Sequence, residues 1–421
     1  MSEQQVKKPR RPMSKSLIMV RQQLADLYKE AQEAKARGEK IGWSASIFPQ
    51  ELCETLGIVV VYPENHSAGI AARHQAEPYL QRAEGEQEYN NDLCSYAKIN
   101  LAYIESRDLP EHNMPMPDFL LCANNICNQV TKWYENLSRK YDIPLFMLDM
   151  SFNHQNFVTP SREKYIRAQM DDIIEQLEKL TGKKFDQDRF REIMEISTEN
   201  KDLWIKANEL LTNIPAPLNG FELFNYMSAM VCCRGRRSTT EIMKQLISEI
   251  EEHIKNGTST YQGEQKYRVY WEGIACWPHV SHNLKIMRKL GMNMVVTAYV
   301  RAWALDYIPG DLDSLARAYT FNASNNTPIE TFVERRSRDL IKFNCDGMIY
   351  HLNRSCKVMD MQQAEVQRQI QAKTGVPFVS FDGDQSDFRN YSEAQFETRM
   401  EAFAELMDEF KATKKNKEAQ K

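Results

Sequence analysis

Three of the nine cysteines lie in polar turns, where their side chains are suited to binding a metal. Cys127 and Cys356 each follow a predicted strand and open a predicted helix, and open parallel sheets collect their ligands at such strand ends. The positive end of a helix dipole favours a thiolate, which is the form of cysteine that binds iron or zinc. Cys94 lies in the polar turn 91–96. We therefore predict that three loop cysteines converge on one mouth. Packing remains the alternative, because compact Cys-x-x-Cys pairs are absent.

The other six cysteines occur in helical or apolar contexts, where free cysteine commonly acts as a small buried hydrophobe. We assign packing roles to Cys53, Cys122, Cys232, Cys233, Cys276 and Cys345. We place Cys122 and Cys276 in apolar strands and Cys345 at the start of one. An odd number of cysteines and no export signal argue against disulfides and predict a cytoplasmic protein. His351, close in sequence to Cys356, is a further candidate for the same mouth.

Apolar, β-branched runs alternate with amphipathic stretches in two separate regions of the chain. This alternation predicts an α/β fold of two flavodoxin-like or Rossmann-like lobes with parallel sheets and an additional helical region. The predicted strands are 57–62, 118–122, 143–148, 267–271, 292–297, 347–351 and 376–380, and the long helices are 17–38, 161–182, 186–213 and 239–256.

One pattern occurs in both regions and suggests two related βαβ units. Each copy reads strand, Asn-x-x-Cys, helix, x-Pro, strand and Asp. The first copy contains Asn124 and Cys127, and the second contains Asn353 and Cys356. Coincidence is the alternative, because strand–turn–helix units are common in α/β folds.

Composition excludes several other classes of protein. The chain has 421 residues, 42% of them hydrophobic, and a formal charge of −4, so it is an ordinary globular protein of two or three domains. Mild acidity argues against nucleic acid as the partner, and no apolar run is long enough to cross a membrane. Phosphate-binding glycine loops and dinucleotide fingerprints are absent from the sequence.

We predict five segments: a disordered basic arm (1–16), a first lobe (17–160), a helical region (161–262), a second lobe (263–410) and a basic tail (411–421).

Nine short segments together resemble the alpha subunits of 2-hydroxyacyl-CoA dehydratases, in the superfamily that also contains benzoyl-CoA reductase. The family includes 2-hydroxyglutaryl-, 2-hydroxyisocaproyl- and lactyl-CoA dehydratases. The resemblance extends from about residue 20 to about residue 410. The matching segments are Gly42–Ser46, Tyr62–Asn65, Asp92–Tyr96, Cys122–Asn128, Lys132–Glu135, Asn219–Phe221, Trp271–Ile274, Asn353–Lys357 and Phe381–Gln385.

The resemblance implies a ligand set and two further site residues. Cys94, Cys127 and Cys356 would bind one [4Fe–4S] cluster whose fourth iron keeps an open site for the substrate's thioester carbonyl. Ser46 would hydrogen-bond the open ligand or that carbonyl, and Glu64 is the candidate for proton transfer. From the residues alone, Ser46 as a helix cap and Glu64 as a surface carboxylate are the alternatives.

The family's reaction removes water from an (R)-2-hydroxyacyl-CoA in syn fashion and gives an (E)-2-enoyl-CoA. A ketyl radical anion forms when one electron enters the thioester, and the electron is recovered at the end. The resemblance also implies oxygen sensitivity, a role in amino-acid fermentation, a beta subunit with its own cluster, and an ATP-dependent iron–sulfur activator.

Two other functions stay open from the sequence. One is a subunit of an ATP-driven acyl-CoA reductase of the benzoyl-CoA type, and the other is a non-catalytic electron-transfer subunit. Within the dehydratases, lactyl, 2-hydroxyisocaproyl, phenyllactyl and 2-hydroxyglutaryl substrates all occur. The segment Ala302–Leu305 is more similar to members that act on aliphatic acyl groups.

Overall fold

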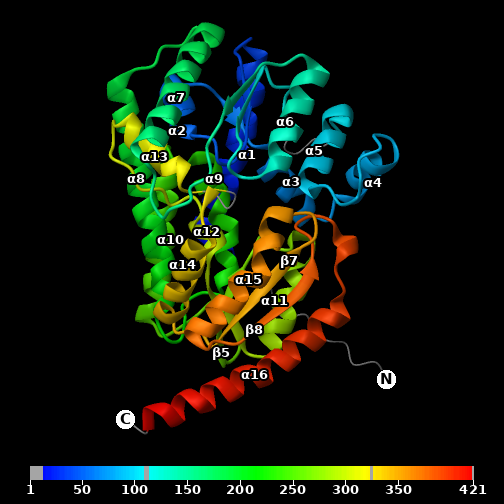
Figure 1. Cartoon of the computed structure of the whole chain (residues 1–421), viewed down its shortest axis with the longest axis vertical. Coiled ribbons are helices and arrows are strands. Elements are labelled where there is room, and N and C mark those ends of the chain that lie inside the picture. Colours follow the sequence, from blue (N-terminus) through cyan, green and yellow to red (C-terminus); the bar gives the residue numbers. More distant parts are fainter. Residues whose placement is uncertain (1–12, 109–112, 323–325, 420–421) are drawn as a thin grey trace.

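Two four-stranded parallel sheets form the centres of two lobes (Figure 1), which confirms the predicted α/β class. The computed structural model describes residues 13–108, 113–322 and 326–419. The first sheet has the order β2-β1-β3-β4, with β1 (Gly42–Ser44), β2 (Val60–Val61), β3 (Phe119–Ala123) and β4 (Leu145–Leu148). The second has the order β6-β5-β7-β8, with β5 (Tyr267–Glu272), β6 (Met292–Thr297), β7 (Gly347–Asn353) and β8 (Phe378–Gly383).

The central strands are buried along almost their whole length because helices cover both faces of a parallel sheet. Every residue of β3 is buried, as is every residue of β5. Helices of the first lobe are α1 (Lys15–Ala36), α2 (Gln50–Leu56), α3 (Pro63–Ala72), α4 (Glu77–Gly85), α5 (Ser95–Ser106) and α6 (Asn128–Tyr141). Those after β5 are η3 (Trp277–His279), α11 (Val280–Lys289), α12 (Ala298–Arg301), α13 (Leu312–Thr320), α14 (Ile329–Lys342), α15 (Lys357–Thr374), η5 (Phe388–Asn390) and α16 (Glu393–Ala419).

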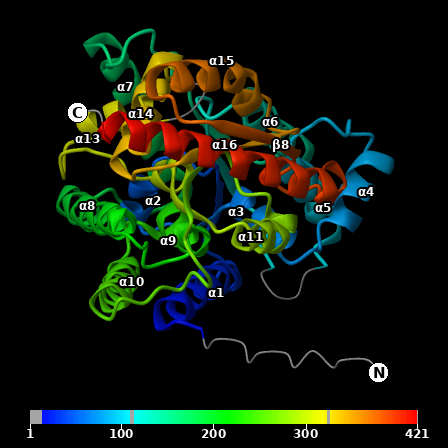
Figure 2. The ribbon, with the colours of Figure 1, turned by 90° about the horizontal axis from the view of Figure 1, so that it is seen from below.

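A helical region joins the two lobes. It contains α7 (Pro160–Thr181), α8 (Gln187–Glu209), α9 (Met227–Cys233) and α10 (Arg237–Lys255), with the 3-10 turns η1 (Leu210–Thr212) and η2 (Gly220–Tyr226). Helix α10 buries Ile242, Leu246 and Ile250, whose spacing places them on one face of the helix. Helix α10 contacts both α8 and α1 (Figure 2). The predicted long helices are therefore present.

The two sheets share one strand order, in which the second strand of each lobe lies outside the first and the third and fourth follow on the other side. In such a sheet the connections change direction between the first and third strands, and ligands bind beyond the strand ends at that point. The repeated pattern of the sequence corresponds to β3–α6–β4 and β7–α15–β8, both with parallel strands. The prediction of two related βαβ units is thus confirmed as a structural likeness.

One predicted strand is much shorter than expected. Residues 57–62 contain only the two-residue strand β2. Gly57 takes the left-handed conformation (φ 65°) that ends α2, and this conformation is incompatible with a strand. The β-branched run therefore begins in a turn and reaches the sheet only at Val60.

Both predicted terminal segments are partly helical. Residues 1–12 of the predicted arm lie outside the described residues, while Lys15 and Ser16 belong to α1. Ser16 is buried and bonds Tyr226 and Glu249. At the other end α16 continues to Ala419, so the predicted basic tail is helical for most of its length.

Candidate active site

A cavity of about 1140 Å³ lies between the lobes, and the carboxyl ends of both sheets open into it. Small-ligand sites usually measure roughly 300–1,000 Å³, so this cavity can hold a large substrate. It is lined by all five residues that the family resemblance implies as site residues, which are Ser46, Glu64, Cys94, Cys127 and Cys356. The structure therefore brings together side chains that lie up to 310 positions apart in the sequence. Their chemical roles stay predictions.

Each of the three cysteines occupies the position that immediately precedes a helix. Cys94 caps α5, Cys127 caps α6 and Cys356 caps α15. The first backbone N–H groups of a helix have no partner within the helix and carry a partial positive charge. The Cys127 sulfur accepts a hydrogen bond from the Val130 N–H at 3.3 Å. The helix ends and their backbone N–H groups therefore favour a thiolate at all three positions, against the opposing effect of burial.

The thiols lie close enough to affect one another's ionisation. Burial raises the pKa of Cys94 to about 12, and the charge of Cys127 adds to this shift. Burial likewise raises the pKa of Cys127 to about 11. The pKa of Cys356 lies well above its usual value because of burial and then the charges of Cys127 and Cys94. Three gathered thiolates repel one another, and a cationic metal group removes that penalty.

A side chain missed by the sequence analysis supports Cys94 from the other lobe. Gln385, in the loop after β8, donates a hydrogen bond from Nε2 to the Cys94 sulfur at 3.2 Å. The backbone N–H of Cys94 donates to Oε1 of Gln129, on α6, at 2.7 Å. Gln385 belongs to a segment that carries the family resemblance, and its position after a strand was the available signal.

Three thiols that line one cavity form a donor set of the kind that holds an iron–sulfur cluster. Among the described residues, no three His, Cys, Asp or Glu side chains are grouped tightly enough to hold one metal ion. In an iron–sulfur cube each cysteine binds its own iron, so the protein sulfurs stand farther apart than ligands of one ion. Cys94, Cys127 and Cys356 line one cavity and are each partly exposed to it, which suits such a group.

Ser46 and Glu64 form a hydrogen-bonded pair on the first-lobe side of the cavity. Ser46 follows β1, and Glu64 lies in the first turn of α3, after β2. The Ser46 backbone N–H donates to Oε2 of Glu64 at 2.7 Å, and its hydroxyl donates to Oε1 at 3.0 Å. Burial raises the Glu64 pKa to about 7, although both bonds from Ser46 lower it. Glu64 can therefore exchange a proton near neutral pH, and it is not an ordinary surface carboxylate.

Aromatic side chains contribute to the wall of the cavity. Trp303 donates from its indole N–H to the backbone carbonyl of Ser46 at 3.2 Å. Trp277 donates to the Tyr96 hydroxyl at 2.5 Å, and the Tyr299 ring packs edge-on against Trp303. These residues line the cavity and make its inner wall largely apolar. Such a wall excludes water from the region of the cysteines.

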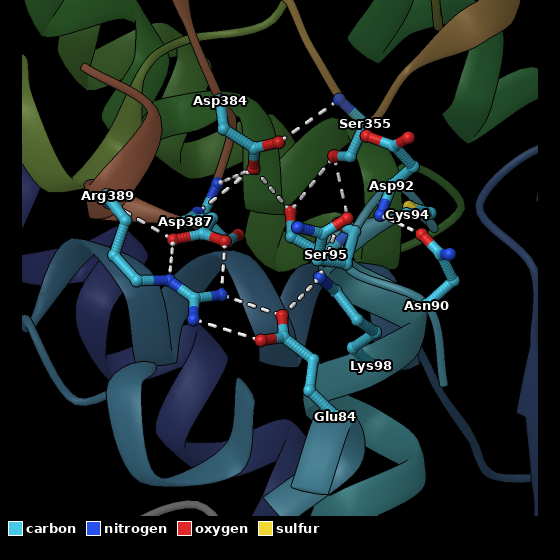
Figure 3. A network of polar contacts seen from close by, with 12 residues as sticks. Glu84, Asn90, Asp92, Cys94, Ser95, Lys98, Ser355, Asp384, Asp387 and Arg389 are labelled. Atoms are coloured by element: carbon cyan, nitrogen blue, oxygen red, sulfur yellow. Dashed lines mark hydrogen bonds and ion pairs between the residues drawn. The ribbon is translucent and has the colours of Figure 1, made fainter. Parts of the chain in front are cut away.

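A buried polar network joins the lobes directly behind the cysteines (Figure 3). Asp384, after β8, accepts hydrogen bonds from the Ser95 hydroxyl at 2.6 Å and the Ser355 N–H at 3.2 Å. It also accepts from two N–H groups of its own loop. Ser95 and Ser355 adjoin Cys94 and Cys356, respectively. Asp384 therefore fixes two of the three cysteine-bearing turns relative to each other.

The remaining cysteines and His351 do not line the cavity. Five of the six cysteines assigned to packing are at most 2% exposed, and Cys345 is 4% exposed. The strand assignment was wrong for Cys276, which lies in the turn before η3, and Cys345 stands two residues before β7. The proposal that His351 shares the mouth is also wrong. Its ring is buried in β7, where it bonds the Ile274 carbonyl and stacks on Phe381.

Comparison with known proteins gives one consistent result. The family model described as 2-hydroxyglutaryl-CoA dehydratase, D-component, matches residues 45–407. The chain is 47% identical to the (R)-2-hydroxyisocaproyl-CoA dehydratase alpha subunit of Clostridioides difficile over 395 residues, which is 94% of this chain and 96% of the relative. It is 45% identical to the (R)-phenyllactyl-CoA dehydratase alpha subunit of Clostridium sporogenes over 377 residues (90% and 92%). A more distant relative is a benzoyl-CoA reductase subunit of Thauera aromatica, 25% identical over 412 residues (94% and 95%).

These matches, together with the two-lobed fold and its shared cavity, define an enzyme of the hydro-lyase class. The chain belongs to the 2-hydroxyglutaryl-CoA dehydratase D-component family. Within the described ranges, no helix combines the length and the apolar character needed to cross a bilayer.

Proposed function

We propose that this chain is the alpha subunit of an oxygen-sensitive (R)-2-hydroxyacyl-CoA dehydratase that forms an (E)-2-enoyl-CoA. The observation that supports this proposal most strongly is the convergence of Cys94, Cys127, Cys356, Ser46 and Glu64 on one cavity between the lobes. High identity to two dehydratase alpha subunits, against 25% to a reductase subunit, favours dehydration over net reduction.

The reaction is difficult because the proton lost from C3 is not adjacent to the thioester carbonyl and is barely acidic. Transient one-electron reduction of the thioester to a ketyl radical anion solves this problem, since the radical anion expels the C2 hydroxyl and the resulting radical has an acidic C3 proton. A [4Fe–4S] cluster held by Cys94, Cys127 and Cys356 would supply a redox-active Lewis acid for that carbonyl.

Glu64 is suited to carry the proton from one end of this elimination to the other. With a pKa of about 7, its carboxyl group can start protonated and give its proton to the departing hydroxyl, which leaves as water. The carboxylate so formed then takes the C3 proton and returns to its first state. One group can serve both steps because a syn elimination releases the hydroxyl and the proton on the same side.

Ser46 holds that carboxyl group in place through its N–H and its hydroxyl. The hydroxyl can also turn toward a substrate oxygen in the cavity. The Trp303 bond to the Ser46 carbonyl fixes the turn, and the aromatic wall protects a reactive radical from water. We assign Ser46 to positioning Glu64 and to hydrogen-bonding the substrate carbonyl.

The substrate's acyl group is proposed to be apolar. The lining contributed by the segment after α12 includes Ala302, Trp303 and Leu305, and η2 and α9 add Phe224 and Met227. These side chains offer an aliphatic or aromatic acyl group a surface without a matching charge. Relatives named for 2-hydroxyisocaproyl and phenyllactyl substrates agree with that choice.

The proposed partners are a beta subunit that carries its own cluster and an ATP-dependent iron–sulfur activator that delivers the first electron. Relatives named as alpha subunits support the first partner. The test is anaerobic reconstitution of the complex with its activator, followed by product analysis on a panel of 2-hydroxyacyl-CoA thioesters. We expect enoyl-CoA without net consumption of electrons. A reduced acyl-CoA formed with stoichiometric electron use would instead identify a reductase.

A further inference from the structure

Four arginines line the same cavity on the side formed by α12 and α14. Arg301 ends α12, and the others are Arg335, Arg336 and Arg338 on α14. Their exposure increases in steps, because the side chain of Arg336 is 9% exposed, that of Arg301 24% and that of Arg338 64%. The group therefore extends from the interior of the cavity to its rim.

The negative charges that face these arginines are too few to match them. Glu272 forms a two-pronged ion pair with Arg336, at 2.9 and 3.0 Å, and this pair is buried and complete. Asp339 is shared, since it lies 3.0 Å from Arg301 and 3.6 Å from Arg338. Two carboxylates thus face four guanidinium groups, which leaves an excess of two positive charges at the rim.

Arg335 accounts for one of the two excess charges. Among the described residues, no carboxylate lies within ion-pair distance of its guanidinium, which stacks 5.2 Å from the centroid of the Phe321 ring. Burial lowers the pKa of Arg335, and the neighbouring charges of Arg336, Arg338 and Arg301 lower it further. Planar guanidinium groups match phosphate oxygens in geometry and bind them two bonds at a time.

The arginines and the three cysteines line the same cavity. Residues of helix α12 are close to both groups. The charges of Glu64 and Cys356 raise the pKa of Tyr299, near the start of this helix, and Arg301 at its end pairs with Asp339 on α14. A coenzyme A thioester carries its reacting carbonyl at one end and its phosphates at the other, so a ligand of this kind offers a partner to each of the two groups of side chains.

We propose that Arg335, Arg338 and Arg301 form an anion subsite that binds the phosphate groups of the coenzyme A part of the substrate. This inference rests on the proposed function, since it presupposes a coenzyme A thioester. Arg336 is excluded from the subsite because its donors are already engaged by Glu272. The subsite anchors the substrate at the rim, so that the pantetheine arm directs the thioester inward to the cysteines.

The experiment measures equilibrium binding of free coenzyme A and of pantetheine to the anaerobically purified complex. We expect Arg335→Gln and Arg338→Gln each to weaken coenzyme A binding by roughly 10- to 100-fold, the effect of losing a charge-assisted bond, and to leave pantetheine binding unchanged. The matched control is Arg368→Gln on α15, an exposed arginine paired with Glu365, which should change neither affinity. Unchanged melting temperatures would show that the variants are folded.

Three outcomes would overturn the inference. Coenzyme A affinity could stay the same in both variants, or pantetheine could weaken equally, which would indicate a structural role. A pantetheine thioester of a dicarboxylic acyl group could be the only ligand affected, which would assign the arginines to a substrate carboxylate. Failure of the proposed function is distinct, because the reconstituted wild-type complex would then form no enoyl-CoA, whatever its affinity for coenzyme A.

Discussion

In the first lobe Cys127 follows Asn124 by three residues, and in the second lobe Cys356 follows Asn353 in the same way. Both cysteines precede a helix. Both asparagines accept a hydrogen bond from a backbone N–H in the loop after the next strand, β4 in one lobe and β8 in the other. The repeated sequence pattern is thus a repeated structural device, which holds one cysteine at the carboxyl end of each sheet.

The loops that these asparagines hold have different tasks. The loop after β4 carries Asp149, which accepts a hydrogen bond from Tyr165 of α7 and so faces the helical region. The loop after β8 carries Asp384 and Gln385, which contact Ser95 and the sulfur of Cys94 in the opposite lobe. The second lobe therefore supports the third cysteine, which the repeat itself does not provide.

The outer strands differ as well. Strand β2 is followed by Glu64, a carboxyl group that titrates near neutral pH, whereas β6 is followed by Tyr299 and Arg301. In our proposal, proton transfer belongs to the first lobe and substrate anchoring to the second. Two lobes with the same strand order can therefore each provide a cysteine to one cavity, while the residues around these cysteines differ.

Removing the proton carrier of the first lobe should have the largest effect on turnover. Glu64→Gln keeps the shape and the hydrogen-bonding capacity of the side chain but cannot exchange a proton. We expect kcat to fall by about 10²- to 10⁴-fold, the usual contribution of a general acid–base group. The control is Glu77→Gln, another acid in the first turn of a helix, α4, which should retain full activity. Equal activity of the two variants would show that Glu64 does not transfer a proton in the reaction.

Replacing the Ser46 hydroxyl, which donates to Glu64, should lower turnover less than Glu64→Gln does and should also change the Glu64 pKa. Ser46→Ala removes one of two hydrogen bonds that lower the Glu64 pKa, so that pKa should rise. We expect kcat to drop about 10- to 100-fold, as for loss of one hydrogen bond to a reacting group. Ser44→Ala, two residues away in β1, is the matched control. If the serines prove interchangeable in this assay, the chain is better explained as a non-catalytic subunit.

The pH profile links the two substitutions. Because Glu64 must begin protonated, the wild-type rate should fall as the pH rises through about 7, by tenfold for each further unit. The fall should move to higher pH in Ser46→Ala and disappear in Glu64→Gln. Stopped assays across this pH range would show it. A wild-type rate that increases through pH 7 would mean that the carboxylate acts first as a base.

Weakening the contact between the lobes should affect stability more than chemistry. Asp384→Asn loses the charge of a fully buried carboxylate that accepts four hydrogen bonds, which should lower the free energy of unfolding by about 2–3 kcal/mol. Thermal unfolding of the complex measures the change. Asp382→Asn, an exposed neighbour paired with Arg399, should stay within about 0.5 kcal/mol of wild type. Equal melting temperatures would show that the lobes are held together elsewhere.

Much of the fold is predictable because its signals are local. Buried parallel strands are continuous apolar runs, and amphipathic helices such as α10 repeat at the spacing of one helix face, so both appear within a short window of sequence. The shortened strand at Gly57 escaped prediction because a glycine ends the preceding helix inside an otherwise β-branched run. The extent of α16 was missed because its last turns are polar all round.

The site was predictable only in part. Cysteines before predicted helices carry a local signal, and the family resemblance added Ser46 and Glu64. The hydrogen bond from Gln385 to Cys94 joins residues that lie 291 positions apart in the sequence. No local sequence pattern around either residue predicts this contact. His351 was wrongly assigned to the cavity because it is close to Cys356 in the sequence. That closeness does not indicate to which side of a strand a side chain points.

The central claim is that Cys94, Cys127 and Cys356 together hold one [4Fe–4S] cluster. The most direct measurement is the iron and acid-labile sulfide content of the anaerobically purified complex, with EPR spectra, for wild type, Cys127→Ala and Cys232→Ala. We predict that Cys127→Ala loses four irons per alpha chain relative to wild type while Cys232→Ala, changed at a buried packing cysteine, loses none. The same iron content in all three complexes, or stoichiometric zinc in place of iron, would contradict the account.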